Sequence, residues 1–303
     1  MPNLTFYQLD VFTKTPFGGN PLAVFTDARG LSGEEMQTLA REMNLSETVF
    51  VLASDKALRR LRIFTPTQEL PLAGHPVVGT WHLLARLGVT PQCENGSIEI
   101  EQELDLGVLP VEIVFRAGEP ETVVMTQGKY EAGPIIRDAR EIARLAEGLG
   151  LAPADLLVDE KTPIQISSTG IKALDVPVRS LDALGRIDIN SSLLAKCYLP
   201  YGAVGCYVYT FETKEKDSRV HARFFAPDDA IAEDPATGSA AGSLAACLLD
   251  HGAIEAGDLT IEQGDFMHRP SRIRARVEGA PGRVERVRIG GPAVLVAKGE
   301  VFY

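Results

Sequence analysis

The chain lacks the cysteine patterns that mark disulfide-rich or zinc-binding proteins. Its 303 residues include four cysteines, and none of them shows the C-x-x-C spacing of a zinc knuckle. Structural disulfides are poorly supported for the same reason. We therefore expect reduced, mostly buried thiols and no metal site.

The chain also lacks a surplus of positive charge. Its 30 lysines and arginines face 41 aspartates and glutamates, which gives a formal net charge of −11. A protein that binds nucleic acid usually presents a basic face. We therefore expect no nucleic acid among its partners.

Long apolar runs are absent as well. The first six residues do not form a basic stretch followed by an apolar core, and no apolar run is long enough to cross a bilayer. The apolar content of 45% is typical of folded soluble proteins. These features predict a cytoplasmic protein with no membrane partner.

Two segments of the chain, residues 62–80 and 223–239, have nearly the same pattern. In each, a strand-like run ends at a proline, and a polar residue then precedes Pro-x-x-Gly-Thr/Ser and an apolar helical segment. We predict an α+β fold of two pseudo-duplicated lobes, each a sheet wrapped around a central apolar helix. The predicted lobes are residues 1–126 and 127–303, and a return of the last strand to the first lobe is left open.

The two matched helix starts are candidate binding positions. Proline is favoured at the first helical position, so Pro76 and Pro235 predict His75 and Asp234 as N-caps. Histidine is an unusual N-cap, which favours a functional role there, whereas Asp234 and Ser239 taken alone suit plain capping and a helix hydroxyl. Helix starts attract carboxylates, so two facing starts suit an anionic small molecule.

Glu47 is a candidate catalytic carboxylate. It follows a predicted helix that ends near residue 44, and it lies on a loop at the mouth of a strand-like run. Loop ends held by strands commonly carry catalytic groups, although a single glutamate is more often an ordinary surface residue. Gly18, Gly19 and Asn20 either present backbone donors to an anion or form a plain hairpin turn.

Taken together, several motifs resemble the PhzF-like family of phenazine biosynthesis. They occur in the family's order over most of the chain. They are Asp-Val-Phe-Thr at 10–13, Phe-Gly-Gly-Asn-Pro-Leu-Ala-Val at 17–24, Asn-Leu-Ser-Glu-Thr at 44–48, Ala-Gly-His-Pro at 73–76, Ser-Thr-Gly at 168–170 and Glu-Asp-Pro-Ala-Thr-Gly-Ser-Ala at 233–240.

The resemblance implies a diaminopimelate-epimerase fold with its site between two similar lobes. It also implies an isomerase without cofactor or metal, in which Glu47 moves a proton between carbons of the substrate. The residues expected to bind and orient that substrate are His75, Asp234, Ser239, Gly74, Gly238 and Asn20. The resemblance does not identify the substrate.

Proton transfer by one carboxylate is chemically reasonable, because an acid that stays close and shielded from water can return the proton it took. Some epimerases of this fold use two cysteines as bases, one at each helix start. That mechanism is disfavoured for this chain, since no cysteine stands at either helix start. The main alternative is a non-catalytic small-molecule binding protein, and a serine hydrolase at Ser239 is weaker. A homodimer is expected from base rates. Whether residues 263–271 form a loop near the site or a solvated turn stays open.

Overall fold

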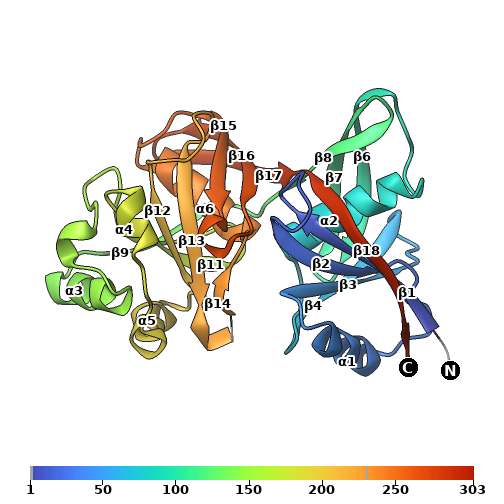
Figure 1. Cartoon of the computed structure of the whole chain (residues 1–303). Helices are drawn as coiled ribbons and strands as arrows, with labels where there is room; N and C mark the ends of the chain where they lie inside the picture. Colours follow the sequence, from blue (N-terminus) through green and yellow to red (C-terminus); the bar gives the residue numbers. More distant parts are fainter. Residues whose placement is uncertain (1–2, 230) are drawn as a thin grey trace. The chain divides into compact units, whose positions relative to one another are not determined.

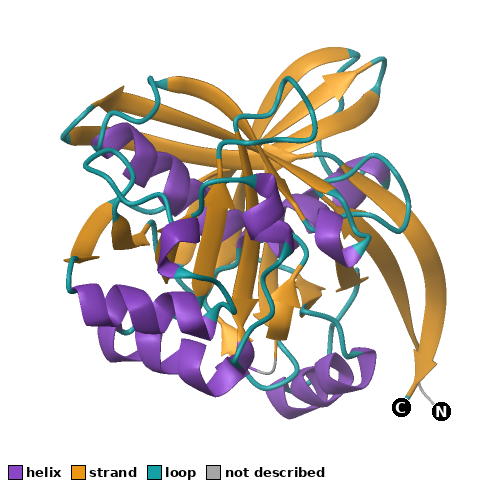
Figure 2. Cartoon of the chain, turned by 60° about the vertical axis from the view of Figure 1, so that its left-hand side comes forward, coloured by secondary structure: helices purple, strands orange, loops and turns teal. Residues whose placement is uncertain are grey.

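The computed structural model describes residues 3–229 and 231–303, and it divides the chain into two compact units (Figure 1). Unit 1 comprises Met1–Thr126 and Gly290–Tyr303, and unit 2 comprises Gln127–Ile289. Both units contain helices packed on strands (Figure 2), so the predicted α+β class is confirmed. No helix within the described part of the chain is long and apolar enough to cross a membrane.

Unit 1 is built on one series of paired strands. Its elements are β1 (Asn3–Val11), β2 (Asn20–Phe25), α1 (Gly33–Met43), β3 (Glu47–Leu52), β4 (Arg59–Phe64), β5 (Glu69–Leu70), α2 (Gly74–Arg86), β6 (Asn95–Leu104), β7 (Gly107–Arg116), β8 (Glu119–Thr126) and β18 (Ala293–Phe302). Strand β18 pairs antiparallel with β1, which also pairs with β2. Strand β2 then pairs parallel with β3, and β4 pairs parallel with β6.

Unit 2 repeats this series. Its elements are β9 (Glu131–Ile136), α3 (Ala139–Gly148), η1 (Pro153–Asp155), β10 (Ile164–Ser168), β11 (Lys172–Pro177), α4 (Leu181–Gly185), α5 (Ser191–Tyr198), η2 (Leu199–Tyr201), β12 (Cys206–Thr210), β13 (Val220–Ala226), η3 (Pro227–Asp229), β14 (Ile231–Asp234), α6 (Gly238–Asp250), β15 (Gly257–Gln263), η4 (Asp265–Met267), β16 (Ser271–Ala280) and β17 (Arg283–Gly291), whose last two residues belong to unit 1. Strand β11 pairs parallel with β12, and β13 pairs parallel with β15.

The order of parallel and antiparallel pairs is therefore the same in both units. In each, a parallel pair is followed by an antiparallel pair, then by a short antiparallel strand, then by a second parallel pair that spans the central helix. This agreement extends the duplication seen in the sequence from one motif to a whole set of elements. The predicted pseudo-duplicated architecture is confirmed.

A single apolar helix forms the centre of each unit. Every residue of α2 is buried except Arg86, and every residue of α6 is buried except Ser239 and Asp250. Helix α2 packs on β1, β2, β3, β7, β8 and β18, and α6 packs on β10, β11 and β16 (Figure 1). Each helix and its C-cap residue are followed by a glycine with positive φ, Gly88 after α2 and Gly252 after α6. Apolar residues around the whole circumference are what a helix enclosed by a sheet requires.

The predicted helix starts were wrong by a few residues. Helix α2 begins at Gly74 with Ala73 as its N-cap, so His75 lies inside the first turn, where Pro76 needs no hydrogen-bonding N–H. Helix α6 begins at Gly238 with Thr237 as its N-cap. Asp234 is instead the last residue of β14 and pairs with a residue of β13.

Candidate active site

In unit 1 the structure brings Glu47 and His75 together. Glu47 is the first residue of β3 and His75 is the second residue of α2. His75 Nε2 lies 3.2 Å from Glu47 Oε2, and the two side chains are only 6% and 15% exposed. The contact lacks the alignment of a hydrogen bond at Nε2. The two groups are thus adjacent, and their geometry does not fix which of them carries a proton.

His75 is a neutral imidazole near pH 7. Burial lowers its pKa from 6.5 to about 3, because the charged form loses its hydration. Its place at a helix N-terminus acts in the same direction, since the N-terminal end of the helix dipole disfavours a cation. Although a carboxylate 3.2 Å away would favour the imidazolium, the burial of the ring outweighs that attraction.

Asn20 and Gly74 lie in the same unit and at related positions. Asn20 is the first residue of β2 and is fully buried, and the parallel β2–β3 register aligns Leu22 with Glu47. Gly74 is the first residue of α2, which packs on both strands. The starts of β2, β3 and α2 therefore carry four of the predicted site residues, Asn20, Glu47, Gly74 and His75.

The loop before Asn20 is held by a buried carboxylate. Asp10 is 1% exposed, and its Oδ2 accepts a hydrogen bond from the Phe17 N–H at 2.6 Å. Phe17 has a φ of 70°, and Gly19 has a φ of 57°. A left-handed conformation is costly for a phenylalanine, so the loop conformation is imposed by contacts such as this one.

In unit 2 the Asp234 carboxylate is fixed by its own helix. Asp234 is 7% exposed, and the Thr237 hydroxyl donates to its Oδ2 at 2.5 Å. The carboxylate therefore stands beside the first turn of α6. Gly238 and Ser239 are the first two residues of that helix, and Ser239 is partly exposed. The N–H groups of this first turn have no partner within the helix, as in any α-helix.

Two glutamine side chains support the start of α6. Gln127 Nε2 donates to the Gly238 carbonyl at 2.9 Å, and its Oε1 accepts from the Thr169 hydroxyl at 2.7 Å. Gln263, at the end of β15, bonds both Asp234 and Thr237. Neither glutamine was predicted as a site residue. Thr169 and Thr237 stand inside recognised motifs, whereas nothing local in the sequence marks Gln127.

The segment after Gln263, left open by the sequence, packs on the start of α6. The Ser271 hydroxyl lies 3.2 Å from the Pro235 carbonyl. A Cβ on Gly264 would lie 2.5 Å from the same carbonyl, and Gly264 has a φ of 79°. Only glycine can approach the Pro235 carbonyl so closely in this conformation. The segment is therefore a turn packed against Pro235.

The predicted site residues thus fall into two sets. Asn20, Glu47, Gly74 and His75 belong to unit 1, whereas Asp234, Gly238 and Ser239 belong to unit 2. The cysteines take no place at either helix start. All four are free, and Cys247 lies in the last part of α6. Within the described residues, no group of three or more His, Cys, Asp or Glu side chains is arranged to hold a metal ion.

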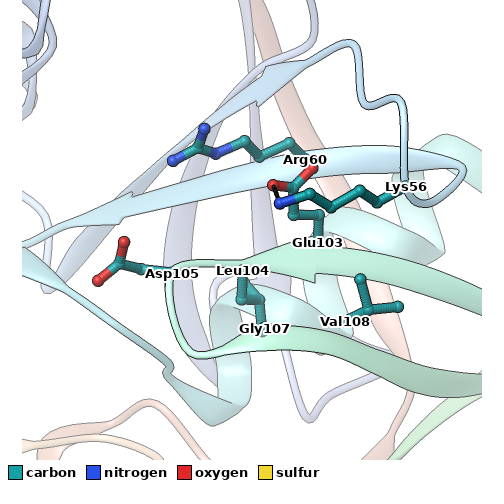
Figure 3. A pocket seen from close by; sticks show the side chains of 7 residues that line it. All are labelled: Lys56, Arg60, Glu103, Leu104, Asp105, Gly107 and Val108. Atoms are coloured by element: carbon teal, nitrogen blue, oxygen red, sulfur yellow. Dashed lines mark hydrogen bonds and ion pairs between the residues drawn. The ribbon is translucent and has the colours of Figure 1, made fainter.

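Unit 1 also carries a hollow of about 370 Å³ that contains none of these residues (Figure 3). It is lined by Lys56, Arg60, Glu103, Leu104, Asp105, Gly107 and Val108. Lys56 Nζ lies 3.5 Å from Glu103 Oε1, so cation and carboxylate already neutralise each other. Arg60 and Asp105 add one further charge of each sign, so the lining as a whole carries no net formal charge.

Comparison with protein families decides the identity of the chain. The model of the phenazine biosynthesis-like proteins matches residues 9–299. The chain belongs to this phenazine biosynthesis-like family. The PhzF-like resemblance inferred from the motifs is thereby confirmed.

The relatives of this phenazine biosynthesis-like protein are named isomerases. The trans-2,3-dihydro-3-hydroxyanthranilate isomerase of Pseudomonas aeruginosa is 35% identical over 299 residues, covering 98% of this chain and 99% of the relative. An uncharacterized isomerase of Clostridium acetobutylicum is 35% identical, with 97% of each chain covered. The predicted enzyme class, an isomerase, is confirmed.

Solved structures agree with this assignment. The crystal structure of a PhzF-family phenazine biosynthesis protein from Bacillus anthracis matches with a TM-score of 0.89 and 30% identity, covering all of both chains. A hydroxyproline epimerase from Agrobacterium vitis matches with a TM-score of 0.65 and 11% identity, over 99% of this chain and 91% of that one. This distant likeness shows the fold alone, which is consistent with the predicted diaminopimelate-epimerase fold.

Proposed function

We propose that this isomerase moves a proton between carbons of a small, carboxylate-bearing substrate, with Glu47 as the proton carrier. The observation that carries the proposal is the 3.2 Å contact between Glu47 Oε2 and His75 Nε2, made by two largely buried side chains. A general base must remain close to the reacting carbons if it is to take a proton from one and give a proton to another. The Glu47 side chain is 15% exposed, so the proton that it carries can exchange with solvent before it is given back.

The reaction balances without a co-reactant. One C–H bond breaks as Glu47 takes the proton, and the electron pair shifts through the neighbouring double bond. Glu47 then returns the proton to a second carbon, so the product is an isomer of the substrate. Nothing is oxidised or reduced overall, and the proposed chemistry therefore requires no redox cofactor.

His75 supports this cycle by remaining neutral. With its pKa near 3, the imidazole can face Glu47 either as an N–H donor to the carboxylate or as an acceptor from the carboxylic acid. It therefore tolerates both protonation states of Glu47. A cationic imidazole would bind the carboxylate too strongly to let it take up a proton.

The remaining predicted residues are proposed to bind the substrate. Backbone N–H groups near Gly74 and Gly238 lie at helix starts, which favour the substrate carboxylate. Asn20 and Ser239 supply side-chain hydrogen bonds, and Asp234 accepts from a donor on the substrate. This set is the basis for proposing an anionic small molecule as the partner.

Glu47→Gln tests the proposal, because it keeps the shape of the side chain and removes the base. In D2O, the wild-type protein should incorporate deuterium into trans-2,3-dihydro-3-hydroxyanthranilate, the compound named for the relatives, or into another small carboxylate of similar size. In the variant, incorporation should fall at least 1,000-fold (about 4 kcal/mol of barrier). Glu42→Gln, at an exposed position of α1, is the matched control and should be unaffected.

Two results would count against the proposal. Unchanged deuterium incorporation in Glu47→Gln would remove Glu47 from the role. Ligand-induced thermal stabilisation of the wild-type protein without any deuterium incorporation would favour the alternative, a binding protein without catalysis. The expected homodimer is tested separately by light scattering, which should give twice the chain mass of 32.7 kDa.

A further inference from the structure

Gln263 is a fully buried side chain with all of its hydrogen-bonding capacity used. Its Oε1 accepts from the Thr237 N–H at 3.0 Å and from the Tyr207 hydroxyl at 3.0 Å. Its Nε2 donates to the Asp234 carbonyl at 2.7 Å and to Thr237 Oγ1 at 3.0 Å. An amide offers two acceptor sites and two donors, and here each of the four has a partner.

The orientation of this amide follows from its backbone partners. The Thr237 N–H can only donate and the Asp234 carbonyl can only accept, so Oε1 must face the first and Nε2 the second. Thr237 Oγ1 therefore receives a proton from the amide. Its own single proton is left to point at Asp234 Oδ2, 2.5 Å away. The direction of donation, from the Gln263 amide to the Thr237 hydroxyl and from that hydroxyl to the Asp234 carboxylate, is thus fixed.

The surroundings hold the amide in place. Tyr207 is buried in β12, and Gly264, the next residue, lies so close to Pro235 that a Cβ would stand 2.5 Å from its carbonyl. The Ser271 hydroxyl lies within hydrogen-bond distance of both the Pro235 and Gln263 carbonyls, at 3.2 Å and 3.1 Å. The amide is therefore held by Tyr207 of β12 and by the segment that leads into α6, while Ser271 of β16 bonds the backbone of both Gln263 and Pro235.

We propose that Gln263 is a positioning residue that acts through Thr237 to hold the Asp234 carboxylate and the first turn of α6 in their substrate-binding arrangement. This inference rests on the proposed function, because it assigns Gln263 and Thr237 a role toward the substrate contact at Asp234. Gln263 itself does not touch the substrate. Small displacements of a positioned group can cost about a hundredfold in rate. Loss of the relay, by which we mean the hydrogen bonds from Gln263 through Thr237 to Asp234, should therefore lower kcat/KM.

Four variants test the relay. Gln263→Met keeps the volume and removes the amide, and Thr237→Val removes the hydroxyl; each should lower kcat/KM at least tenfold. Thr237→Ser keeps the hydroxyl and should remain within about threefold of wild type. The double variant Gln263→Met with Thr237→Val should be no worse than the less active single variant, because both changes break one chain of contacts.

Gln165→Met is the matched control for the loss of a buried glutamine. Gln165 is 3% exposed and bonds Gly133 and His251, at the other end of α6 from Asp234. It should change kcat/KM by less than threefold. Equal losses in Thr237→Ser and Thr237→Val, or an unchanged kcat/KM in Gln263→Met, would overturn the proposal.

Amide hydrogen exchange separates a failure of this inference from a failure of the proposed function, because it needs no substrate. The backbone amide of residue 237 should exchange at least tenfold faster in Gln263→Met than in wild type. The same amide should stay protected in Gln165→Met and, as the amide of the new valine, in Thr237→Val. If wild type turns over neither trans-2,3-dihydro-3-hydroxyanthranilate nor another small carboxylate of similar size, the proposed function is wrong. An unchanged Thr237 exchange in Gln263→Met would overturn the positioning role whatever the outcome with substrate.

Discussion

At the scale of single residues, burial sets the protonation of groups that would otherwise be charged. His75 is the clearest case within the candidate site, since its pKa lies near 3. Glu47 was identified from a motif and a strand start, and the structure brings the two side chains within 3.2 Å. The sequence indicated both residues but could not indicate the charge of the imidazole, because burial depends on the folded environment.

Asp175 shows the opposite effect on a carboxyl group. It lies on β11, is completely buried, and accepts a hydrogen bond from the Ser167 hydroxyl at 2.5 Å. Burial raises its pKa from 3.8 to about 8, because desolvation penalises the anion. The folded protein therefore keeps this proton at pH values where the unfolded chain has lost it.

We predict that Asp175→Asn stabilises the protein near neutral pH. Between about pH 4 and pH 8 the folded state binds one more proton than the unfolded state, so Asp175 lowers the free energy of unfolding by up to about 1.4 kcal/mol for each pH unit of rise. Asparagine keeps the shape and cannot ionise. Urea unfolding of variant and wild type should show a difference that is small near pH 4 and grows to at least about 2 kcal/mol near pH 7.

Asp217→Asn, at an exposed position between β12 and β13, is the control for this measurement. It should leave the pH dependence of the free energy of unfolding unchanged. An Asp175→Asn variant that is less stable than wild type near pH 7 would show that the buried carboxyl is needed as an anion.

At the scale of elements, the sequence predicted the two central helices correctly but placed both starts wrongly. The rule that favours proline at the first helical position also allows proline anywhere in the first turn, where N–H groups lack helical partners. Tertiary contacts determine the residue at which α6 begins. The Gln263 side chain accepts a hydrogen bond from the Thr237 N–H, and Asp234 pairs with β13. Such contacts come from residues distant in sequence and leave no local signal.

The short helices α4 and α5 were not predicted at all. Both have N-cap residues that bond the first turn, Ser180 and Asn190, so a capping signal was present. Their lengths of five and eight residues are too short for a hydrophobic period to be recognised. Packing of Leu184, Leu194 and Tyr198 into the core of unit 2 stabilises them instead.

Gly79→Ala should destabilise unit 1, although glycine to alanine in a helix normally stabilises by about 1 kcal/mol. A Cβ at Gly79 would lie 2.6 Å from both Leu22 Cδ2 and Val11 Cγ2. Overpacking of this kind costs about 1–3 kcal/mol. Gly33→Ala in α1, which meets only the flexible end of the Arg62 side chain, should cost less than about 0.5 kcal/mol by urea unfolding.

A Gly79→Ala variant as stable as the Gly33→Ala variant would contradict this explanation. It would mean that α2 can move away from β1 and β2 without loss. The close approach at Gly79 would then have no part in holding α2 against these strands.

At the scale of the whole molecule, the two units share a pairing order that the sequence revealed in one motif only. The motif covers a strand, a loop and the start of the central helix, which occupy equivalent positions in the two units. The other paired elements have diverged in side chains while keeping their directions. Packing constrains direction and burial more tightly than identity, which explains why the duplication is clearer in topology than in sequence.

Unit 1 depends on β18, and we predict that removal of this strand selectively destabilises β1 and β2. Strand β18 pairs with β1 from Ala293 to Phe302. A chain that stops after Gly291 loses these hydrogen bonds and exposes one edge of β1. Amide hydrogen exchange should then rise at least tenfold in β1 and β2, whereas the strands of unit 2, which has its own apolar core, should keep their protection.

An equal rise of exchange in β12 and β13 would show that unit 2 cannot hold its structure when unit 1 is opened. Unchanged exchange in β1 would show that its pairing with β2 is sufficient.

The pairing of β1 with β18 also has a consequence during synthesis on the ribosome. Strand β1 is made together with its neighbour β2, but its second partner, β18, emerges only after all of Gln127–Ile289 has been translated. Domains generally fold as units while the chain grows. Unit 2 can therefore complete its folding before β18 has been made and has paired with β1. The edge of β1 that β18 covers in the folded protein therefore stays open while unit 2 is translated, and an open strand edge can pair with other chains.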